Sequence, residues 1–448
     1  MMRKGTALAK GGAAMQRALN WICTTRGGLV TVWAAYLLPR LALCLLHVTP
    51  TSDADYYFHR AAELAAGRGY LSIHGVPTAY WPPGWPLALS LAFHAIGPGL
   101  LAVKLLNLAA ATLTGFLVLD LGPRLFGAKG AGRLGLLLLA LYPNNAAYMP
   151  LGLTEVFYTA LLLAGCWLMI ARTDLVSLGL AGLVFGLATL VKAQTLVCVP
   201  LILAIGLIRQ AQVAPAFWRG VIGGIPASFG RFVLIIAFAA LVVAPWSLRN
   251  ARELGQPVLL STNGGITLLT GNCDRCNGGF TPDDPVVKAL DARKDLDEVA
   301  YDREAKRLGM AWIRSHPIRF VEMMPVKLFK LWGPDGEAQW AYETGYAGFG
   351  AHAGLFRAMR AINQLWYWSL LSGAALAAGM MIRQRRRAGE PWVDWWLLPY
   401  CIVAYLSAVA MVFSGQTRFH YPAMPLLCVA CGWLLALWVA RGKPAKDR

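Results

Sequence analysis

The segment that decides the fold is residues 175–209, LVSLGLAGLVFGLATLVKAQTLVCVPLILAIGLIR, an apolar stretch interrupted at Lys192-Ala193-Gln194. A helix that crosses a membrane needs about 20 mainly apolar residues. We interpret the interruption as a tight turn between two short spans, 175–190 and 195–209. This segment predicts an integral membrane protein.

Similar apolar runs recur along the chain and bring the number of candidate spans to about ten. They are approximately 29–48, 100–121, 133–150, 156–172, 175–190, 195–209, 230–247, 364–382, 393–413 and 420–440. We therefore expect an all-α polytopic membrane protein with about ten transmembrane helices.

The composition supports the same class of protein. Of the 448 residues, 57% are hydrophobic and 14% are charged, whereas a soluble domain has about 45–50% apolar and about 25% charged residues. These values exclude an ordinary soluble enzyme, a disordered tail and a disulfide-rich secreted domain. The net charge of +18 does not indicate a nucleic-acid partner, because the basic residues flank long apolar runs and accompany no readable binding motif.

The positions of the charges predict the topology. Lysine and arginine favour short cytoplasmic loops. The expected cytoplasmic pieces hold 20 basic residues and four acidic ones, whereas the two large segments on the opposite side, 49–99 and 249–363, together hold 17 of each sign. The basic N-terminus leads into a full-length apolar helix without a cleavage site, which predicts a signal anchor. We expect a multi-pass protein of the bacterial inner (plasma) membrane, with both termini in the cytoplasm.

This topology predicts five regions. They are a cytoplasmic basic N-terminus (1–28), a transmembrane catalytic module (29–248) that includes the first extracytoplasmic loop (49–99), a mixed extracytoplasmic loop domain (249–363), C-terminal transmembrane helices (364–440) and a cytoplasmic tail (441–448). Within the first loop, 55–66 has helical spacing, and the apolar stretch 85–97 is too short for a span and suits a half-helix at the membrane surface.

Three acidic residues on the outer side are candidates for chemistry. Asp53 and Asp55 lie just beyond the first span, where they could bind a divalent cation or abstract a proton from a hydroxyl; a solvated loop that caps the next helix is the alternative. Glu155 lies among apolar residues at the outer end of a span, and an ionisable group there suggests function. Its alternative role is to complement the dipole at the start of that helix.

Three basic residues fall outside the cytoplasmic pattern. Arg60, Lys192 and Arg418 are all expected on the outer face, next to lipid. Basic groups in this position suit a phosphate anion, and snorkelling at helix ends is the alternative. Their occurrence together with three outer acids favours a site.

Cysteine and histidine give fewer indications. Cys273 and Cys276, in GNCDRCNGG, lie in the predicted outer domain, where we expect them to form a disulfide. Free thiols and a zinc site are the alternatives, and no second CxxC accompanies them. His420 is the best candidate for a site contact among the histidines, most of which are scattered.

The order of several motifs resembles the glycosyltransferase C superfamily. The motifs are SDADYY (52–57), AAGRGY (65–70), PTAYWPPGWPL (77–87), LTEVFYTALLL (153–163), APWSLRN (244–250), LLSTNGGI (259–266) and TRFHYPAMPLL (417–427). They cover most of the chain and look like those of bacterial members similar to dolichyl-phosphate-mannose protein mannosyltransferases and lipid A aminoarabinose transferases. The resemblance implies a glycosyltransferase C-type fold and transfer of a sugar from a polyprenyl-phosphate donor to a glycan, lipid or protein acceptor outside the membrane.

The resemblance also implies roles for the candidate residues. Asp53 falls on the first acidic position and would act as the base in an inverting displacement, while Glu155 falls on the second. Arg60, Lys192 and Arg418 fall where relatives hold the lipid phosphate, and we add Tyr57 and His420 as substrate contacts.

One departure leaves the roles of the acids open. Many relatives have adjacent acids in the first loop, whereas Ala54 separates Asp53 from Asp55 here. Asp55 and Glu155 could hold a divalent metal or orient the acceptor, and no other cofactor is implied. The alternative function is a transporter or flippase of lipid-linked sugars, which the scarcity of ionisable residues within the spans disfavours.

Overall fold

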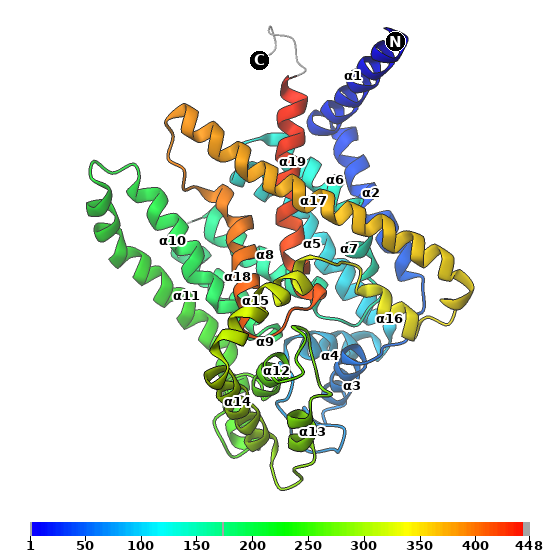
Figure 1. Ribbon diagram of the computed structural model, residues 1–448, viewed down its shortest axis with the longest axis vertical. Coiled ribbons are helices and arrows are strands. Elements are labelled where there is room, and N and C mark those ends of the chain that lie inside the picture. Colours follow the sequence, from blue (N-terminus) through cyan, green and yellow to red (C-terminus); the bar gives the residue numbers. More distant parts are fainter. Residues whose placement is uncertain (1, 173, 442–448) are drawn as a thin grey trace.

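The computed structural model describes residues 2–172 and 174–441, and its regular elements are helices. In chain order these are α1 (Met2–Thr24), α2 (Arg26–Cys44), α3 (Asp53–Ala65), α4 (Gly84–Ile96), α5 (Leu100–Phe126), α6 (Lys129–Ala140), α7 (Pro143–Ala147), α8 (Glu155–Ala171), α9 (Leu175–Val191), η1 (Thr195–Val197), α10 (Cys198–Ala211), α11 (Phe217–Glu253), α12 (Gly264–Gly271), α13 (Pro285–Asp291), α14 (Glu298–Ser315), α15 (Pro317–Trp332), α16 (Ala338–Gly345), η2 (Gly350–His352), α17 (Ala353–Ala388), η3 (Trp395–Leu397), α18 (Leu398–Val412), η4 (Thr417–Ala423) and α19 (Met424–Arg441). The all-α prediction is confirmed, and Figure 1 shows the arrangement.

Six helical segments are long and apolar enough to cross a membrane. They are Arg26–Cys44, Leu100–Phe126, Phe217–Glu253, Gly350–Ala388, Trp395–Val412 and Thr417–Arg441. Three more predicted spans correspond to shorter apolar helices, α8, α9 and η1–α10. The chain is therefore a multi-pass membrane protein, and the turn predicted at 192–194 lies between α9 and η1.

One predicted span is not a single helix. The stretch 133–150 contains the end of α6 and the short helix α7, with a break at Leu141-Tyr142. Pro143 follows this break at the first position of α7, where its missing N–H costs no hydrogen bond, whereas inside a continuous helix it would remove one.

The limits of several predicted regions fall within helices. Residues 2–24 of the expected cytoplasmic N-terminus form helix α1, and the expected tail lies outside the described residues except for Arg441. The boundaries of the predicted loop domain fall inside α11 and α17. Between these helices, the regular elements of the loop domain are the helices α12–α16 and η2.

Close packing of small residues builds the centre of the helix bundle. A Cβ added to Gly432 of α19 would lie 2.4 Å from the backbone nitrogen of Gly135 in α6, and one added to Gly122 of α5 would lie 2.2 Å from that of Gly132. Small residues allow membrane helices to approach this closely. Helices α5, α6 and α19 thus share a backbone-to-backbone interface, from which α8 and α9 extend the core.

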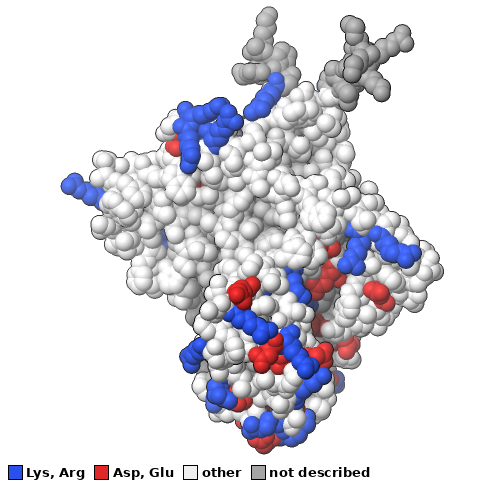
Figure 2. Space-filling model, in the orientation of Figure 1, with Lys and Arg blue, Asp and Glu red and all other residues white. Residues whose placement is uncertain are grey.

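Charged side chains gather at the two ends of the molecule. Figure 2 shows a band almost free of charge between them. At one end, near the last turns of α17, Lys and Arg predominate; at the other, around α12–α14, both signs are present. The N- and C-terminal helices both run to the first end (Figure 1), as expected for a chain with both termini on one side of the membrane.

The two outer segments are joined to each other through two charged side chains. Arg249 donates hydrogen bonds to the carbonyl oxygens of Thr78 (2.7 Å) and Tyr70 (2.8 Å). Glu298 accepts hydrogen bonds from the backbone of Ala79 and the hydroxyl of Thr262. These contacts hold the loop 70–79 against the helical domain, and this loop follows α3, which carries the first acids.

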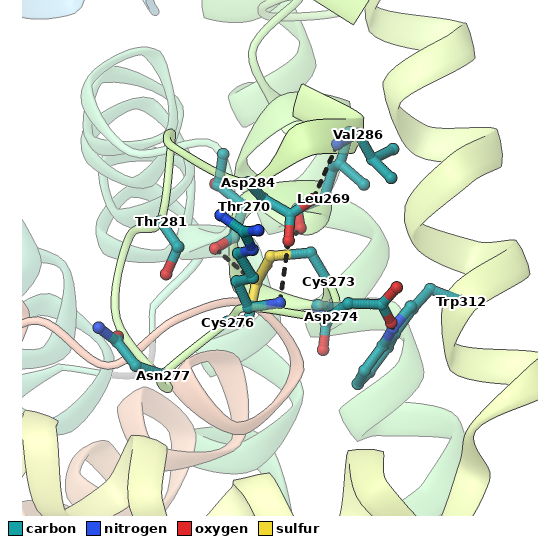
Figure 3. The surroundings of a disulfide bond; sticks show 12 residues. Leu269, Thr270, Cys273, Asp274, Cys276, Asn277, Thr281, Asp284, Val286 and Trp312 are labelled. Atoms are coloured by element: carbon teal, nitrogen blue, oxygen red, sulfur yellow. Dashed lines mark hydrogen bonds between the residues drawn. A yellow bond between two sulfur atoms is a disulfide. The ribbon is translucent and has the colours of Figure 1, made fainter. Parts of the chain in front are cut away.

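Cys273 and Cys276 form a disulfide in the loop after α12 (Figure 3). Asp284 caps α13 by accepting from Val286 N–H, and also accepts from Arg275 N–H inside the CxxC turn. Both cysteines are buried. The CxxC turn is therefore tied to α13 and belongs to the framework of the outer domain.

Candidate functional site

Asp53 is positioned by a strained turn at the start of α3. Among the described residues, Ser52 is the only non-glycine residue with a positive φ (53°), and it directly precedes Asp53. Such backbone conformations cost about 1–3 kcal/mol and persist where surrounding contacts impose them. A carboxylate in the first turn also suits the helix dipole. The turn therefore fixes Asp53 at the helix end that faces the bundle.

Asp53 forms an ion pair with Arg418 of η4. Arg418 NH1 lies 2.7 Å from Asp53 Oδ2, and both side chains are about one fifth exposed. The backbone N–H of Arg418 donates to Glu337 Oε2 (2.9 Å), and the hydroxyl of Thr417 donates to the same oxygen. Glu337 Oε1 also lies 3.8 Å from Arg418 Nε. Glu337 thus holds η4 in place and is a second acid beside Arg418.

Glu337 was not predicted from the sequence. It lies in the segment GPDGEAQW before α16, which contains no motif that distinguishes it from other acids in the outer loops. Only the folding of η4 against this segment brings it to Arg418.

Glu155 and Lys192 form a second ion pair in the same region. Glu155 is the first residue of α8 and Lys192 directly follows α9; Lys192 Nζ lies 3.6 Å from Glu155 Oε1. Glu155 is 1% exposed. Burial lowers the pKa of Lys192, and the charge of Glu155 opposes this shift. The pair is buried and loosely spaced, which leaves both groups able to bind an additional polar atom.

The two ion pairs are neighbours. The Lys192 ammonium and the Arg418 guanidinium lie 5.2 and 5.5 Å from the centre of the Phe419 ring. Tyr57 is buried beside them, and burial, together with the charge of Asp53, raises its pKa. Helices α3 and α8, the end of α9 and η4 therefore converge on one cluster of carboxylates and cations. We call Asp53, Glu155, Lys192 and Arg418 the central cluster.

Asp55 does not belong to the central cluster. It lies two residues after Asp53, on the opposite side of α3, where it is half exposed and pairs with His59 (3.2 Å). The structure thus separates Asp55 from Glu155, and a metal ion shared by these two acids stays a prediction. In residues 2–172 and 174–441 no group of three or more His, Cys, Asp or Glu side chains could hold a metal, and both acids of the central cluster are neutralised by cations.

Arg60 is also separate from the central cluster. It is buried on α3, with its guanidinium carbon 5.1 Å from the centre of the Tyr56 ring. No hydrogen bond or ion pair within the described part of the chain joins it to Lys192 or Arg418. The structure therefore does not assemble the three predicted phosphate-binding residues into one group.

His420 lies in a buried network and does not face the central cluster. Its Nε2 lies 3.2 Å from Asp335 Oδ1, and its ring stacks between Trp332 and Tyr367. Burial acts to raise the pKa of Asp335, but hydrogen bonds and the charge of His420 outweigh it and leave this pKa lowered. His420 is thus part of a buried network with Asp335, and its contact with the substrate stays a prediction.

We expect the variant Asp335→Ala to unfold more easily by about 3–5 kcal/mol, because it leaves the buried donors of Tyr142 and Asn363 without their acceptor. Thermal unfolding of the purified protein measures this effect. His420→Gln should lower the unfolding temperature as well, yet change the catalytic rate of the folded protein by only a few-fold. A loss of rate without a loss of stability would contradict the structural role of His420.

Comparisons with solved structures identify the fold. The oligosaccharyltransferase of Archaeoglobus fulgidus with a tethered acceptor peptide has a TM-score of 0.53 and 12% identity over 93% of this chain and 50% of that one. The same enzyme in complex with Zn and sulfate gives 0.51 and 14%, over 90% and 48%. ArnT from Cupriavidus metallidurans bound to undecaprenyl phosphate gives 0.41 and 14%, over 93% and 77%.

At 12–14% identity, the likeness to the archaeal enzyme is a likeness of fold. The chain spans about half the length of the archaeal oligosaccharyltransferase. No protein-family model matches the sequence, and no curated protein matches it either. The likeness to the archaeal enzyme over most of this chain confirms the expected glycosyltransferase C-type fold.

Proposed function

We propose that this protein is an integral membrane glycosyltransferase. It would move a sugar from a polyprenyl-phosphate donor to the hydroxyl of a glycan, lipid or protein acceptor. The observation that carries this proposal is the central cluster: an acid at a strained helix start, paired with Arg418 and adjacent to the buried Lys192–Glu155 pair. It combines a proton acceptor with two cations suited to phosphate, in a fold shared with a known sugar-transferring enzyme.

The reaction is a single displacement at the sugar carbon. The acceptor oxygen forms a bond to that carbon as the bond to the phosphate oxygen breaks, which inverts the carbon. Asp53 accepts the hydroxyl proton, and polyprenyl phosphate leaves with the bonding electrons. In the free protein Arg418 pairs with Asp53; a donor phosphate competes for the guanidinium and leaves Asp53 to accept a hydrogen bond from the acceptor.

Arg418 and Lys192 stabilise the negative charge of the departing phosphate. Negative charge grows on the departing phosphate, and preorganised cations in a site of low water content stabilise it strongly. Arg418 offers bidentate hydrogen bonds, and Lys192 offers a compact charge. Glu155 keeps the Lys192 ammonium in place through their ion pair. Glu337 holds η4 by accepting a hydrogen bond from the backbone N–H of Arg418. No step in this mechanism depends on a metal ion.

The rate should fall at alkaline pH, because burial lowers the pKa of Lys192. The protonated form binds phosphate, so activity is present below that pKa and is lost as the pH rises through it. An arginine stays protonated throughout this range. In Lys192→Arg the alkaline decline should therefore move to higher pH, as a pH–rate profile would show. An unchanged profile in this variant would contradict the role of Lys192.

The donor should approach from the end of the molecule with both signs of charge. We take the end rich in Lys and Arg as the cytoplasmic side. The central cluster would then face the periplasm or cell exterior of a bacterial inner membrane. The polyprenyl chain would lie in the lipid beside the shorter apolar helices α8 and α9, at whose outer ends Glu155 and Lys192 are found.

The proposal is tested with the full-length protein purified in detergent. Incubation with polyprenyl-phosphate sugars and envelope extracts should yield a glycosylated acceptor and free polyprenyl phosphate, both detected by mass spectrometry. A transporter has no net reaction to perform in detergent, since no membrane separates two compartments. Absence of product from every donor, together with donor movement across vesicle membranes, would contradict the proposal.

A further inference from the structure

Arg60 carries a buried charge without a partner. It is 5% exposed, and its Nε and NH1 atoms have no hydrogen-bond partner. Its guanidinium carbon lies over the face of the Tyr56 ring, and its charge also acts on Glu63. A buried cation without a counter-charge is costly, and a cation–π contact replaces only part of the lost hydration.

The nearby acids are engaged elsewhere. Glu63, one turn later on α3, is paired with Arg68. Glu298 is occupied by the Ala79 N–H and by the Thr262 hydroxyl, and so holds the outer loops together. Neither acid forms an ion pair with Arg60 in the part of the chain that the structure describes. A counter-charge from outside the protein would therefore satisfy Arg60.

Arg60 lies on the same helix, α3, as Asp53, the proposed base. Arg60 is seven positions after Asp53, which is close to two helical turns, so both lie on the same face of α3. The rise between them is about 10 Å at about 1.5 Å per residue. Tyr57 and Ala61, on one side of this face, pack against α4 in a hydrophobic cluster. Tyr56, on the other side, has a buried hydroxyl without a hydrogen-bond partner. A ligand that reaches from Asp53 to Arg60 would therefore lie along the Tyr56 side of α3.

We propose that Arg60 binds a second acidic group on the sugar of the donor. This inference rests on the proposed function, because it takes the sugar carbon that reacts to lie beside Asp53. The donor phosphate is held by Lys192 and Arg418, and a hexose ring then spans the distance along α3 toward Arg60. The substituent at its far side is a carboxylate or a phosphate ester, either of which accepts bidentate hydrogen bonds from a guanidinium. The substrate class is therefore an acidic sugar linked to polyprenyl phosphate.

The test compares three water-soluble sugar phosphates on the full-length protein in detergent: glucose 1-phosphate, glucuronic acid 1-phosphate and glucose 1,6-bisphosphate. Isothermal titration calorimetry gives their affinities. A hydrogen-bonded charge contributes about 1.5–3 kcal/mol, so at least one of the two doubly acidic compounds should bind about 10-fold or more tightly than glucose 1-phosphate. Which of them does so distinguishes a carboxylate from a phosphate.

The variant Arg60→Met should abolish this preference and leave the affinity for glucose 1-phosphate unchanged. Arg60→Gln serves as a second variant if the first does not fold. Arg68→Lys is the matched control, because Arg68 is exposed just beyond the same helix and a lysine keeps a cation beside Glu63; it should keep the preference. Equal binding of all three compounds to the native protein, or an unchanged preference in both Arg60 variants, overturns this inference alone. Binding of none of them contradicts the proposed function as well.

Discussion

Replacing Asp53 with Asn should reduce sugar transfer by at least about 100-fold, the lower range of what a positioned general base contributes. Asn keeps the size of the side chain and can still accept a hydrogen bond from Arg418, but it cannot accept the proton of the acceptor hydroxyl. The initial rate of product formation by the purified protein measures the loss. The unfolding temperature should change little, because the Asp53–Arg418 pair is partly exposed.

Asp55→Asn is the matched control for this prediction. Asp55 lies two residues away on the same helix and has the same chemistry, but it faces solvent and pairs with His59. Its substitution should leave the rate within a few-fold of the native value. A rate for Asp53→Asn within tenfold of native, or an equal loss for Asp55→Asn, would assign the base to another residue.

Breaking the Lys192–Glu155 pair should affect both stability and rate. Lys192→Met leaves the carboxylate of Glu155, which is 1% exposed, without its cation. Removing one partner of a buried pair costs about 3–5 kcal/mol. The same variant lacks a cation for the departing phosphate, and we expect a loss of rate of about 100-fold or more. Chemical denaturation and initial rates measure the two effects separately.

The double variant Lys192→Met/Glu155→Gln separates stability from catalysis. It removes both charges, so most of the stability lost in Lys192→Met should return. The rate should remain low, because the phosphate still lacks its ammonium partner. Recovery of the rate together with stability would falsify a direct role for Lys192 and reduce the pair to a structural contact.

Several elements of the site could be predicted from local sequence. The helical spacing after Asp53 predicted α3, and the polar break at Lys192 predicted the turn after α9. Glu155 was recognisable because an acid next to apolar runs is costly unless it has a function or a partner. Each of these predictions depends on residues that are close together in the chain, so the sequence alone is enough to make it.

Other elements depended on contacts between distant segments. Asp55 and His420 resemble site residues in the sequence, yet one faces solvent and the other joins Asp335. Glu337 has no recognisable motif, and the isolation of Arg60 could not be foreseen. In each case the role depends on which side of a helix the residue occupies and on which distant segment packs against it.

The sequence by itself determined that this chain is a polytopic membrane protein, that its charges divide between two sides, and that acids and cations accumulate on the outer one. Apolar length and charge position decide these properties, because the membrane imposes them on every segment separately. Only the tertiary structure decided which charges meet. Asp53 and Arg418 are 365 positions apart in the chain and lie 2.7 Å apart in space. Their pairing depends on the packing of η4 against α8 and of α3 against the bundle, to which residues throughout the chain contribute.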